Sequence, residues 1–339
     1  MEHIPVYWKT TLEDVEETMK LVKKGRVSIA ATSAGGRPVY QVEYGKSNVK
    51  LGTANLSSAL GAHDSKYYAD KTGEDYIPTF FIDGCIHGGE FEGTMAVLNL
   101  IKLMETGTDY AGEEHLQLLE LMNKLHLIII PVSNPDGRSR VPFSSFVKKT
   151  FYDLQYYNQG TWKDGTLCGW PGCKAVHPIK EKAGFLGGYF NDDGINMMHE
   201  DYFGNVSKET MALFEVCRKE APDVSVLLHG GGNTVNMLVP YKYITMEALE
   251  ESMAVSRRLK ERSDKEGVRY QLRDTRGTND GFTICSAMHH LCGGVVLTYE
   301  SNQGLIDRGD VIYTHEEIYK SHLLLFEEVA KHLLEKYQK

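Results

Sequence analysis

The stretch TFFIDGCIHGGE, residues 79 to 90, combines an apolar run with a polar, glycine-rich turn. Its first part, Thr79 to Ile82, is typical of a strand that is buried on both faces of a sheet. A helical pattern, Gly89 to Leu103, begins at the end of the stretch. Between them, His87 and Glu90 are three residues apart. This spacing lets an imidazole at a strand end and a carboxylate in the first helical turn converge on one metal ion.

The same kind of alternation continues along the chain. Near-continuous apolar runs predict three more buried strands, at Leu125 to Val132, Val224 to Leu228 and Val295 to Thr298. Helical patterns alternate with them at Glu113 to Lys124, Lys208 to Glu220, Met246 to Glu266 and His315 to Lys336. The predicted fold class is therefore α/β, with a mixed central β-sheet sandwiched between helices. In such sheets the active site lies beyond the carboxyl ends of the strands.

Other segments predict the edge of the sheet and its loops. Short β-rich runs at Val27 to Ala30, Val39 to Glu43 and Val49 to Gly52 are expected to form antiparallel edge strands. The segment from Ser139 to Gly194 lacks a periodic element of helix length, as binding loops and surface insertions do. Because no repeat, low-complexity tract or proline-rich linker divides residues 1–339, we expect a single domain.

Composition excludes several classes of function. The net charge of -9 would repel a phosphate backbone, so nucleic acid is not an expected partner. Met1 to Lys9 shows no secretory signal, which predicts a cytoplasmic protein. No apolar run approaches the roughly 20 residues of a membrane helix, so we expect no membrane span. The oligomeric state stays undetermined.

The six cysteines are too few for a disulfide scaffold in a chain of this length. Cys168 and Cys173 are close enough in sequence to form a local disulfide or half of a metal site. No second pair at ligand spacing completes such a site. We therefore favour reduced thiols.

Two further strand ends carry metal-site chemistry. His229 closes the run Val224 to Leu228, and Glu300 follows the run that ends at Tyr299. Each residue alone has an ordinary structural explanation: Glu90 suits any helix amino terminus, and a histidine at a strand end is usually just hydrogen-bonded. Together, two histidines, one glutamate and a spare glutamate supply what catalytic zinc requires, namely three ligands, an open position and a base.

The order of these motifs resembles that of the zinc carboxypeptidases. His87-x-x-Glu90 is followed by Asn134-Pro135-Asp136-Gly137 after a buried strand, then by His229, then by Thr298-Tyr299-Glu300. The early segment Gly36-Arg37-Pro38 is also similar to a Gly-Arg-Pro segment of that family. The resemblance extends from about Gly36 to Glu300, which is most of the chain.

The resemblance implies a peptidase with one zinc ion held by His87, Glu90 and His229. Glu300, which is not a ligand, would take a proton from the water that attacks an amide carbonyl and pass it to the leaving nitrogen. The family stabilises the oxyanion with an arginine downstream of the Asn-Pro-Asp-Gly turn. Arg140 is the favoured match here, and Arg138 beside it is a candidate for substrate binding. Either arginine alone is equally consistent with solvating the loop or pairing with a carboxylate.

One segment departs from the family pattern. The family binds the free carboxylate of its substrate with an Asn-Arg pair, but Met198 and His199 stand at those positions here. A thioether offers no amide donor, and an imidazole gives no bidentate fork. Asn196 and His199 remain candidate substrate contacts. Arg276, or Arg273, is a candidate replacement for the missing arginine.

Three functions fit these motifs. The first is a carboxypeptidase-like peptidase of altered end recognition that acts on peptides. The second is an amidase or deacylase that uses the same zinc site on a small acylated amino acid, a small amide or a modified peptide. The third is an inert zinc-binding or peptide-binding protein, whose expected signature, the loss of a ligand or of the base, is absent from this sequence.

Overall fold

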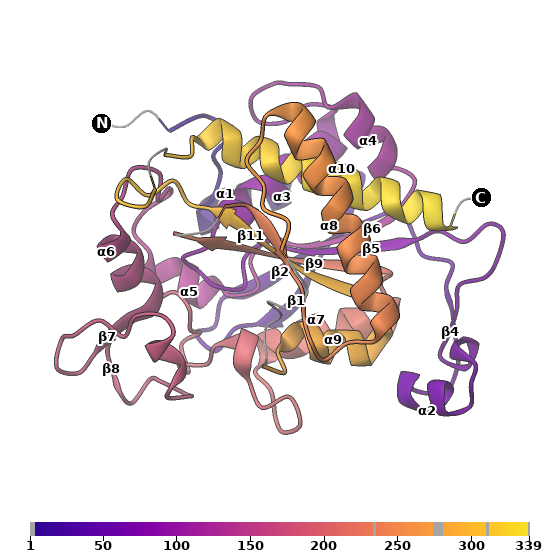
Figure 1. Cartoon of the computed structure of the whole chain (residues 1–339), viewed down its shortest axis with the longest axis horizontal. Coiled ribbons are helices and arrows are strands. Elements are labelled where there is room, and N and C mark those ends of the chain that lie inside the picture. The colour runs from indigo at the N-terminus through magenta and orange to yellow at the C-terminus, as the bar shows by residue number, and fades with distance from the viewer. Residues whose placement is uncertain (1–3, 233–234, 274–280, 310–311, 338–339) are drawn as a thin grey trace.

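The computed structural model describes residues 4–232, 235–273, 281–309 and 312–337, and a mixed sheet runs through their centre (Figure 1). From one edge to the other its strands are β1 (Arg26–Thr32), β2 (Pro38–Tyr44), β6 (His126–Ile130), β5 (Thr79–Asp83), β9 (Val224–Gly231), β11 (Val295–Asn302) and β10 (Met237–Val239). The four strands β6, β5, β9 and β11 are parallel, whereas β1 and β2 at one edge and β10 at the other pair antiparallel. The predicted mixed sheet is confirmed.

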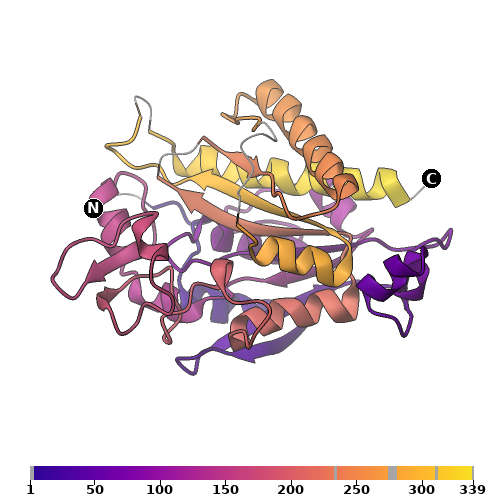
Figure 2. The same ribbon diagram turned by 60° about the horizontal axis from the view of Figure 1, so that its bottom comes forward.

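Helices cover both faces of this sheet, as Figure 2 shows. One face is covered by α3 (Glu92–Thr106), α8 (Met246–Glu266) and α10 (His315–Tyr337), with α1 (Leu12–Leu21) against α3 and α4 (Leu116–Met122) against α10. The other face is covered by α7 (Lys208–Glu220) and α9 (Ile284–Cys292). The helices α7 and α8 have the bounds that the sequence predicts.

Local signals explain these bounds. Helix α8 begins after Thr245, whose side chain accepts a hydrogen bond from the Ala248 N–H, and it ends at Gly267 with a left-handed φ of 69°. Helix α7 begins after Ser207, which caps the Thr210 N–H in the same way. The hydroxyl at each start satisfies a backbone donor that has no partner within the helix.

The core consists of two apolar layers that the central strands separate. In β5, Phe80 and Ile82 contribute to the layer beneath α3, α8 and α10, whereas Phe81 contributes to the layer beneath α7 and α9. All three side chains are fully buried, and at about 25 cal/mol per Å² such burial supplies most of the driving force for folding. Continuous apolar strands are therefore required here, because both faces of each central strand are covered.

The prediction that Val49 to Gly52 forms an edge strand of the central sheet is wrong. The residues Lys50–Leu51 form β3, which pairs with β4 (Ala69–Asp70) in a separate two-stranded sheet. Together with α2 (Leu56–Gly61) and the short helix η1 (Ser65–Tyr67), this sheet projects from the body at the lower right of Figure 1. A two-residue strand carries no periodicity from which its partner can be predicted.

The segment that lacks periodicity forms short elements at one end of the molecule, at the left of Figure 1. They are α6 (Phe151–Leu154), the π-helix η2 (Gln155–Gln159), β7 (Gly160–Trp162), η3 (Gly172–Lys174) and β8 (Ala183–Leu186). The helix α5 (Pro135–Arg140) leads into the segment, and η4 (Met197–His199) follows it. The carboxyl ends of the parallel strands point toward the same end of the molecule (Figure 1).

The six cysteines are free, buried thiols, in agreement with the interpretation favoured from the sequence. Among the helices that the structure describes, none combines the length and the apolar character needed to cross a membrane.

Candidate active site

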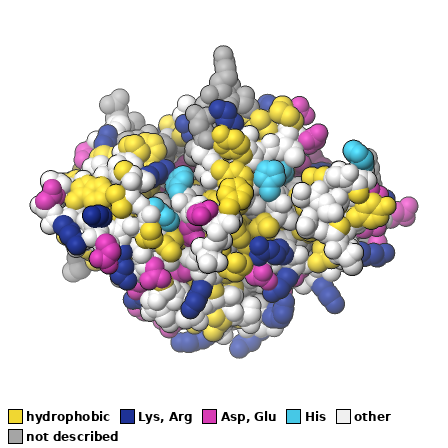
Figure 3. All heavy atoms as spheres, turned by 90° about the horizontal axis from the view of Figure 1, so that it is seen from below, with side chains coloured by type: hydrophobic (Ala, Val, Ile, Leu, Met, Phe, Trp, Pro, Cys, Tyr) yellow, Lys and Arg dark blue, Asp and Glu magenta, His cyan; other side chains and the backbone are white. Residues whose placement is uncertain are grey.

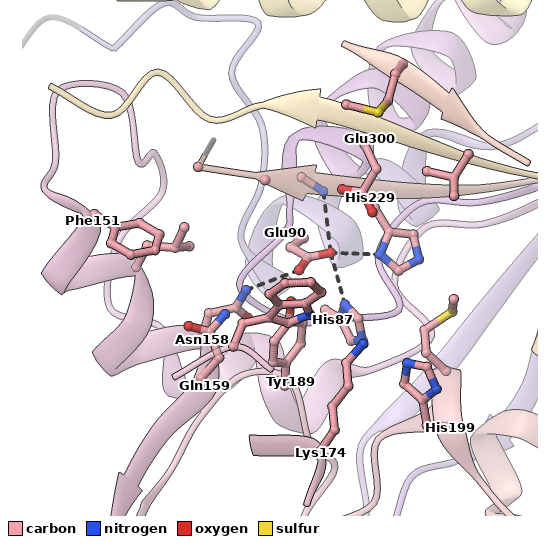
Figure 4. A pocket seen from close by; sticks show the side chains of 18 of the residues that line it. His87, Glu90, Phe151, Asn158, Gln159, Lys174, Tyr189, His199, His229 and Glu300 are labelled. Carbon is pink, nitrogen blue, oxygen red and sulfur yellow. Dashed lines mark hydrogen bonds and ion pairs between the residues drawn. The ribbon is translucent and has the colours of Figure 1, made fainter. Parts of the chain in front are cut away.

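Three side chains from two distant parts of the chain meet at the carboxyl edge of the sheet. The candidate ligand atoms of His87, Glu90 and His229 all lie within 4.8 Å of one another, and all three residues are buried. Oε2 of Glu90 lies 3.0 Å from Nδ1 of His87 and 2.8 Å from Nδ1 of His229 (Figure 4). The structure thus brings together the three residues that the sequence predicts as metal ligands.

The donor set fits a zinc ion. Nε2 of His87 lies 3.1 Å from Oδ1 of Asn196, so this side of the ring carries the proton and donates it to the amide oxygen. In a neutral ring Nδ1 then has no proton, yet it faces a carboxylate oxygen at 3.0 Å. Two acceptors at that distance are complementary to a cation between them, and nitrogen and oxygen ligands of this kind suit Zn²⁺.

The electrostatics of the cluster favour a charged Glu90. Burial acts to raise the pKa of this carboxyl, but the two imidazoles outweigh burial and hold its pKa below the ordinary range. Asn158 Nδ2 also donates to Oε1 of Glu90 over 3.2 Å. For His87, desolvation lowers the pKa of the ring, which favours the neutral form that binds metals.

The loop between β5 and α3 needs glycines to place His87 and Glu90. A Cβ atom at Gly88 would lie 2.0 Å from the backbone nitrogen of Arg138, and one at Gly89 would lie 2.5 Å from Oδ1 of Asn158. The loop therefore passes in direct backbone contact with α5, which only glycine permits.

Glu300 lies beside the cluster because of strand register. It stands opposite His229 in the parallel pairing of β11 with β9, so both side chains reach the same edge of the sheet. Glu300 lines the cavity but is not part of the metal-binding group. Burial raises the pKa of its carboxyl to about 7. A carboxyl group with such a pKa can both accept and return a proton near neutral pH.

A cavity of about 540 Å³ opens in front of these groups. Its walls include Phe151 and Leu154 of α6, Met237 and Val239 of β10, and the backbone of the glycines 230–232. In the space-filling view of Figure 3, histidine, acidic and hydrophobic side chains lie next to one another near the middle of that face. The cavity is large enough for a small peptide or an acylated amino acid.

The structure places some of the predicted substrate contacts in the cavity and others outside it. His199 lines the cavity, and burial lowers the pKa of its ring to about 3, so it is neutral. Asn196 is not among the lining residues and instead supports His87. Arg273 lines the cavity, whereas Arg276 lies outside the described residues.

The predictions for Arg138 and Arg140 require correction, because neither residue lines the cavity. The guanidinium of Arg138 is buried and donates to the backbone oxygens of Thr10, Val141 and Phe143, each over 2.8 Å. Arg140 forms an ion pair with Asp192 and donates to the backbone oxygens of residues 187 and 190. Both arginines hold loops together, and the sequence could not reveal that their side chains turn away from the metal cluster.

Several cavity residues were not predicted from the sequence. Tyr189 packs edge-on against His87 with a centroid separation of 3.9 Å, and Asn158 contacts Glu90. Lys174 and Trp170 stand on the same wall. All four lie in the segment from Ser139 to Gly194, for which the lack of a periodic element was consistent with a binding loop or a surface insertion.

Asp83, the last residue of β5, is a buried carboxyl group close to this site. Ser133 Oγ donates to its Oδ2 over 2.9 Å, and Oδ1 has no hydrogen-bond partner in the described structure. Burial raises the pKa of Asp83 to about 7. The folded protein thus holds the proton more tightly than the unfolded chain does.

We expect the contribution of Asp83 to the stability of the wild-type protein to fall as the pH rises from about 4 to 7, because the unfolded chain releases the Asp83 proton first. Between pH 5 and pH 8 the loss from this group is roughly 3 kcal/mol. In Asp83→Asn the amide stays neutral, so this part of the loss disappears. Urea unfolding of both proteins at the two pH values measures the difference, and equal pH dependence would contradict the expectation.

Comparison with known proteins agrees with the fold and the metal-binding group described above. Residues 13–320 match the family model described as zinc carboxypeptidase. No curated protein sequence matches the chain.

Solved structures share the fold. A metallo-carboxypeptidase from Burkholderia cenocepacia superposes with a TM-score of 0.59 at 15% identity, covering 95% of this chain and 68% of the other. A metallo-carboxypeptidase from Pseudomonas aeruginosa, in complex with (2-guanidinoethylmercapto)succinic acid, gives 0.58 at 12% identity, with 96% and 68% covered. Bovine thrombin-activatable fibrinolysis inhibitor, in complex with tick carboxypeptidase inhibitor, gives 0.56 at 13% identity, with 98% and 100% covered.

Proposed function

Because the chain belongs to the zinc carboxypeptidase family, we propose that it hydrolyses peptide bonds or closely related amide bonds at the cavity around His87, Glu90, His229 and Glu300. The observation that carries this proposal is the convergence of three ligand side chains within 4.8 Å at the cavity that Glu300 also lines. All the strands that contribute to the site belong to one seven-stranded sheet, which supports a single catalytic domain.

His87, Glu90 and His229 would hold one zinc ion, which when bound polarises the amide carbonyl and makes water more acidic. Glu300 accepts a proton from the attacking water and returns it to the nitrogen of the leaving amine. The raised pKa of Glu300, about 7, suits both steps. Asn196 fixes the orientation of the His87 ring, and Asn158 fixes that of the Glu90 carboxylate.

A second candidate function uses the same groups on another substrate. Met198 and the neutral His199 occupy the wall where the family pattern has an Asn-Arg pair. This difference favours an altered substrate end, as in an amidase or deacylase that acts on an acylated amino acid or a modified peptide. An inert binding protein is disfavoured, because both the metal-binding group and the cavity-lining carboxyl group of Glu300 are present.

Hydrolysis of a small panel tests the proposal. We expect zinc-loaded protein to release amine from at least one member of a set of acylated dipeptides, peptide amides and acylated amino acids. A chelator should abolish the release and added zinc should restore it, because without the ion nothing at the three ligands would polarise the amide carbonyl or make the water more acidic. Zinc-replete protein that cleaves no member of the panel would refute the hydrolase proposal and support a binding role.

A further inference from the structure

Hydrolysis at this cavity develops a negative charge on the carbonyl oxygen of the amide. When the oxygen of water bonds to the carbonyl carbon, one electron pair of the C=O bond moves onto the carbonyl oxygen. When the C–N bond breaks, that pair re-forms the C=O bond, and the amine leaves with the proton that Glu300 returns. A fixed cation beside the oxyanion accelerates the reaction, because it binds the oxyanion more strongly than the neutral carbonyl.

The two arginines behind the Asn-Pro-Asp-Gly turn do not supply this cation. Neither Arg138 nor Arg140 lines the cavity. Arg138 donates to three backbone oxygens, each over 2.8 Å, and Arg140 is paired with Asp192. Turning either side chain toward the metal-binding group would leave these acceptors without their donors, which is unfavourable for buried groups. The cation must therefore come from another part of the chain.

Lys174 presents an ammonium group to the cavity. It ends the short helix η3 and lines the cavity together with Trp170, whose ring centroid lies 5.2 Å from its Nζ. Over the described part of the chain, no hydrogen bond or ion pair reaches this ammonium group. In Figure 4 the side chain extends toward His87 and Glu90. The N–H donors of Lys174 are thus available to a substrate atom near the metal-binding group.

The electrostatic surroundings of Lys174 agree with this placement. Desolvation lowers the pKa of its ammonium, while Glu90 and Glu300 act in the opposite direction. The scissile carbonyl must lie between the metal-binding group, which includes Glu90, and the base Glu300. A cation that interacts with both carboxylates therefore lies near the place where the oxyanion develops. Because this ammonium has lost part of its water, a new negative charge interacts with it more strongly than in bulk solvent.

The other polar groups of the cavity are less suited to this role. Asn158 donates to Glu90 over 3.2 Å, and His199 is neutral because burial lowers the pKa of its ring to about 3. Arg273 is the other described cation of the lining and also acts on Glu300. Lys174 is favoured over Arg273, because its side chain is directed toward the metal-binding group.

We propose that Lys174 is a catalytic residue that donates a hydrogen bond to the oxyanion formed at the scissile carbonyl. This inference rests on the proposed hydrolase function and adds a residue to it. It departs from the family pattern, because the positive charge comes from η3 and not from an arginine after the Asn-Pro-Asp-Gly turn. The Trp170 ring supports the cation from one side and leaves its other side to the substrate.

Kinetics of Lys174→Met test the proposal with the best substrate of the panel. We expect kcat to fall by about 10²-fold to 10³-fold, as for the loss of other oxyanion donors. KM should change by less than about threefold, because the neutral carbonyl interacts weakly with the lysine. Lys174→Arg keeps the charge and should retain at least about a tenth of the wild-type kcat. Zinc content and Tm, measured for each variant, should equal those of the wild type.

Inhibitor binding gives a second readout that needs no turnover. A phosphonamidate with the sequence of the substrate carries a tetrahedral, anionic group in place of the scissile amide. Lys174→Met should weaken its binding to the zinc-loaded protein by about the same factor as it lowers kcat/KM, because the inhibitor resembles the transition state. Binding of the uncleaved substrate to zinc-loaded Glu300→Gln protein should be unchanged when Lys174→Met is added.

Lys163→Met is the matched control, because Lys163 is an exposed lysine of the same segment that does not line the cavity. It should leave kcat and inhibitor binding unchanged. A kcat loss below about tenfold in Lys174→Met overturns the proposal, and so does a rise in KM at unchanged kcat. A larger loss of kcat in Arg273→Met than in Lys174→Met also overturns it. Each of these results leaves hydrolysis by the wild-type protein intact, so failure of the proposed function is recognised separately.

Discussion

Glu300→Gln is expected to lower kcat by about 10²-fold to 10⁴-fold and to leave zinc content and folding unchanged. The amide has nearly the size of the carboxylate but cannot take a proton from water. Glu300 lies outside the group that can hold the metal, so its replacement removes no ligand. Steady-state kinetics with the best substrate of the panel, together with a zinc assay, measure both parts of the prediction.

Glu114→Gln serves as the control for this experiment. Glu114 is an exposed glutamate that does not line the cavity, and its replacement should leave kcat unchanged. If Glu300→Gln keeps more than about a tenth of the wild-type kcat, proton transfer must be assigned to another group. Lys174 and Tyr189 are the neighbouring candidates on the cavity wall.

His229→Ala is expected to weaken zinc binding by at least about a hundredfold and to abolish hydrolysis. Replacement of a group that only supports a ligand already costs about 10-fold to 100-fold in affinity, so loss of a ligand should cost no less. Competition with a chelator gives the affinity. The increase in Tm on zinc addition should also become smaller, because the free energy by which bound zinc stabilises the folded state grows with the logarithm of its affinity.

His199→Ala provides a matched comparison for the ligand test. His199 lines the same cavity but does not belong to the metal-binding group, so this variant should bind zinc as the wild type does. Equal zinc affinities for the His229→Ala and wild-type proteins would show that the metal binds elsewhere. A loss of zinc from His199→Ala would point to a ligand set different from the one that the structure presents.

The central part of the fold was predictable because burial on both faces leaves a clear pattern in the sequence. Apolar runs such as Thr79 to Ile82 are typical of strands covered on both faces, and the caps at Thr245 and Gly267 set the ends of α8. The strand at Lys50–Leu51 was assigned to the wrong sheet, since two residues contain no periodicity. Its partner depends on how the segment 52–70 folds back.

The chemistry of the metal centre followed from the sequence alone, because the identities of His87, Glu90, His229 and Glu300 and their places at strand ends restrict what they can do together. Only the tertiary structure decided which cations face the cavity. Arg138 and Arg140 turn to backbone oxygens and Asp192, whereas Lys174, from a segment without periodicity, lines the wall. The direction of a long charged side chain depends on contacts that residues distant in sequence supply, and neither composition nor spacing records those contacts.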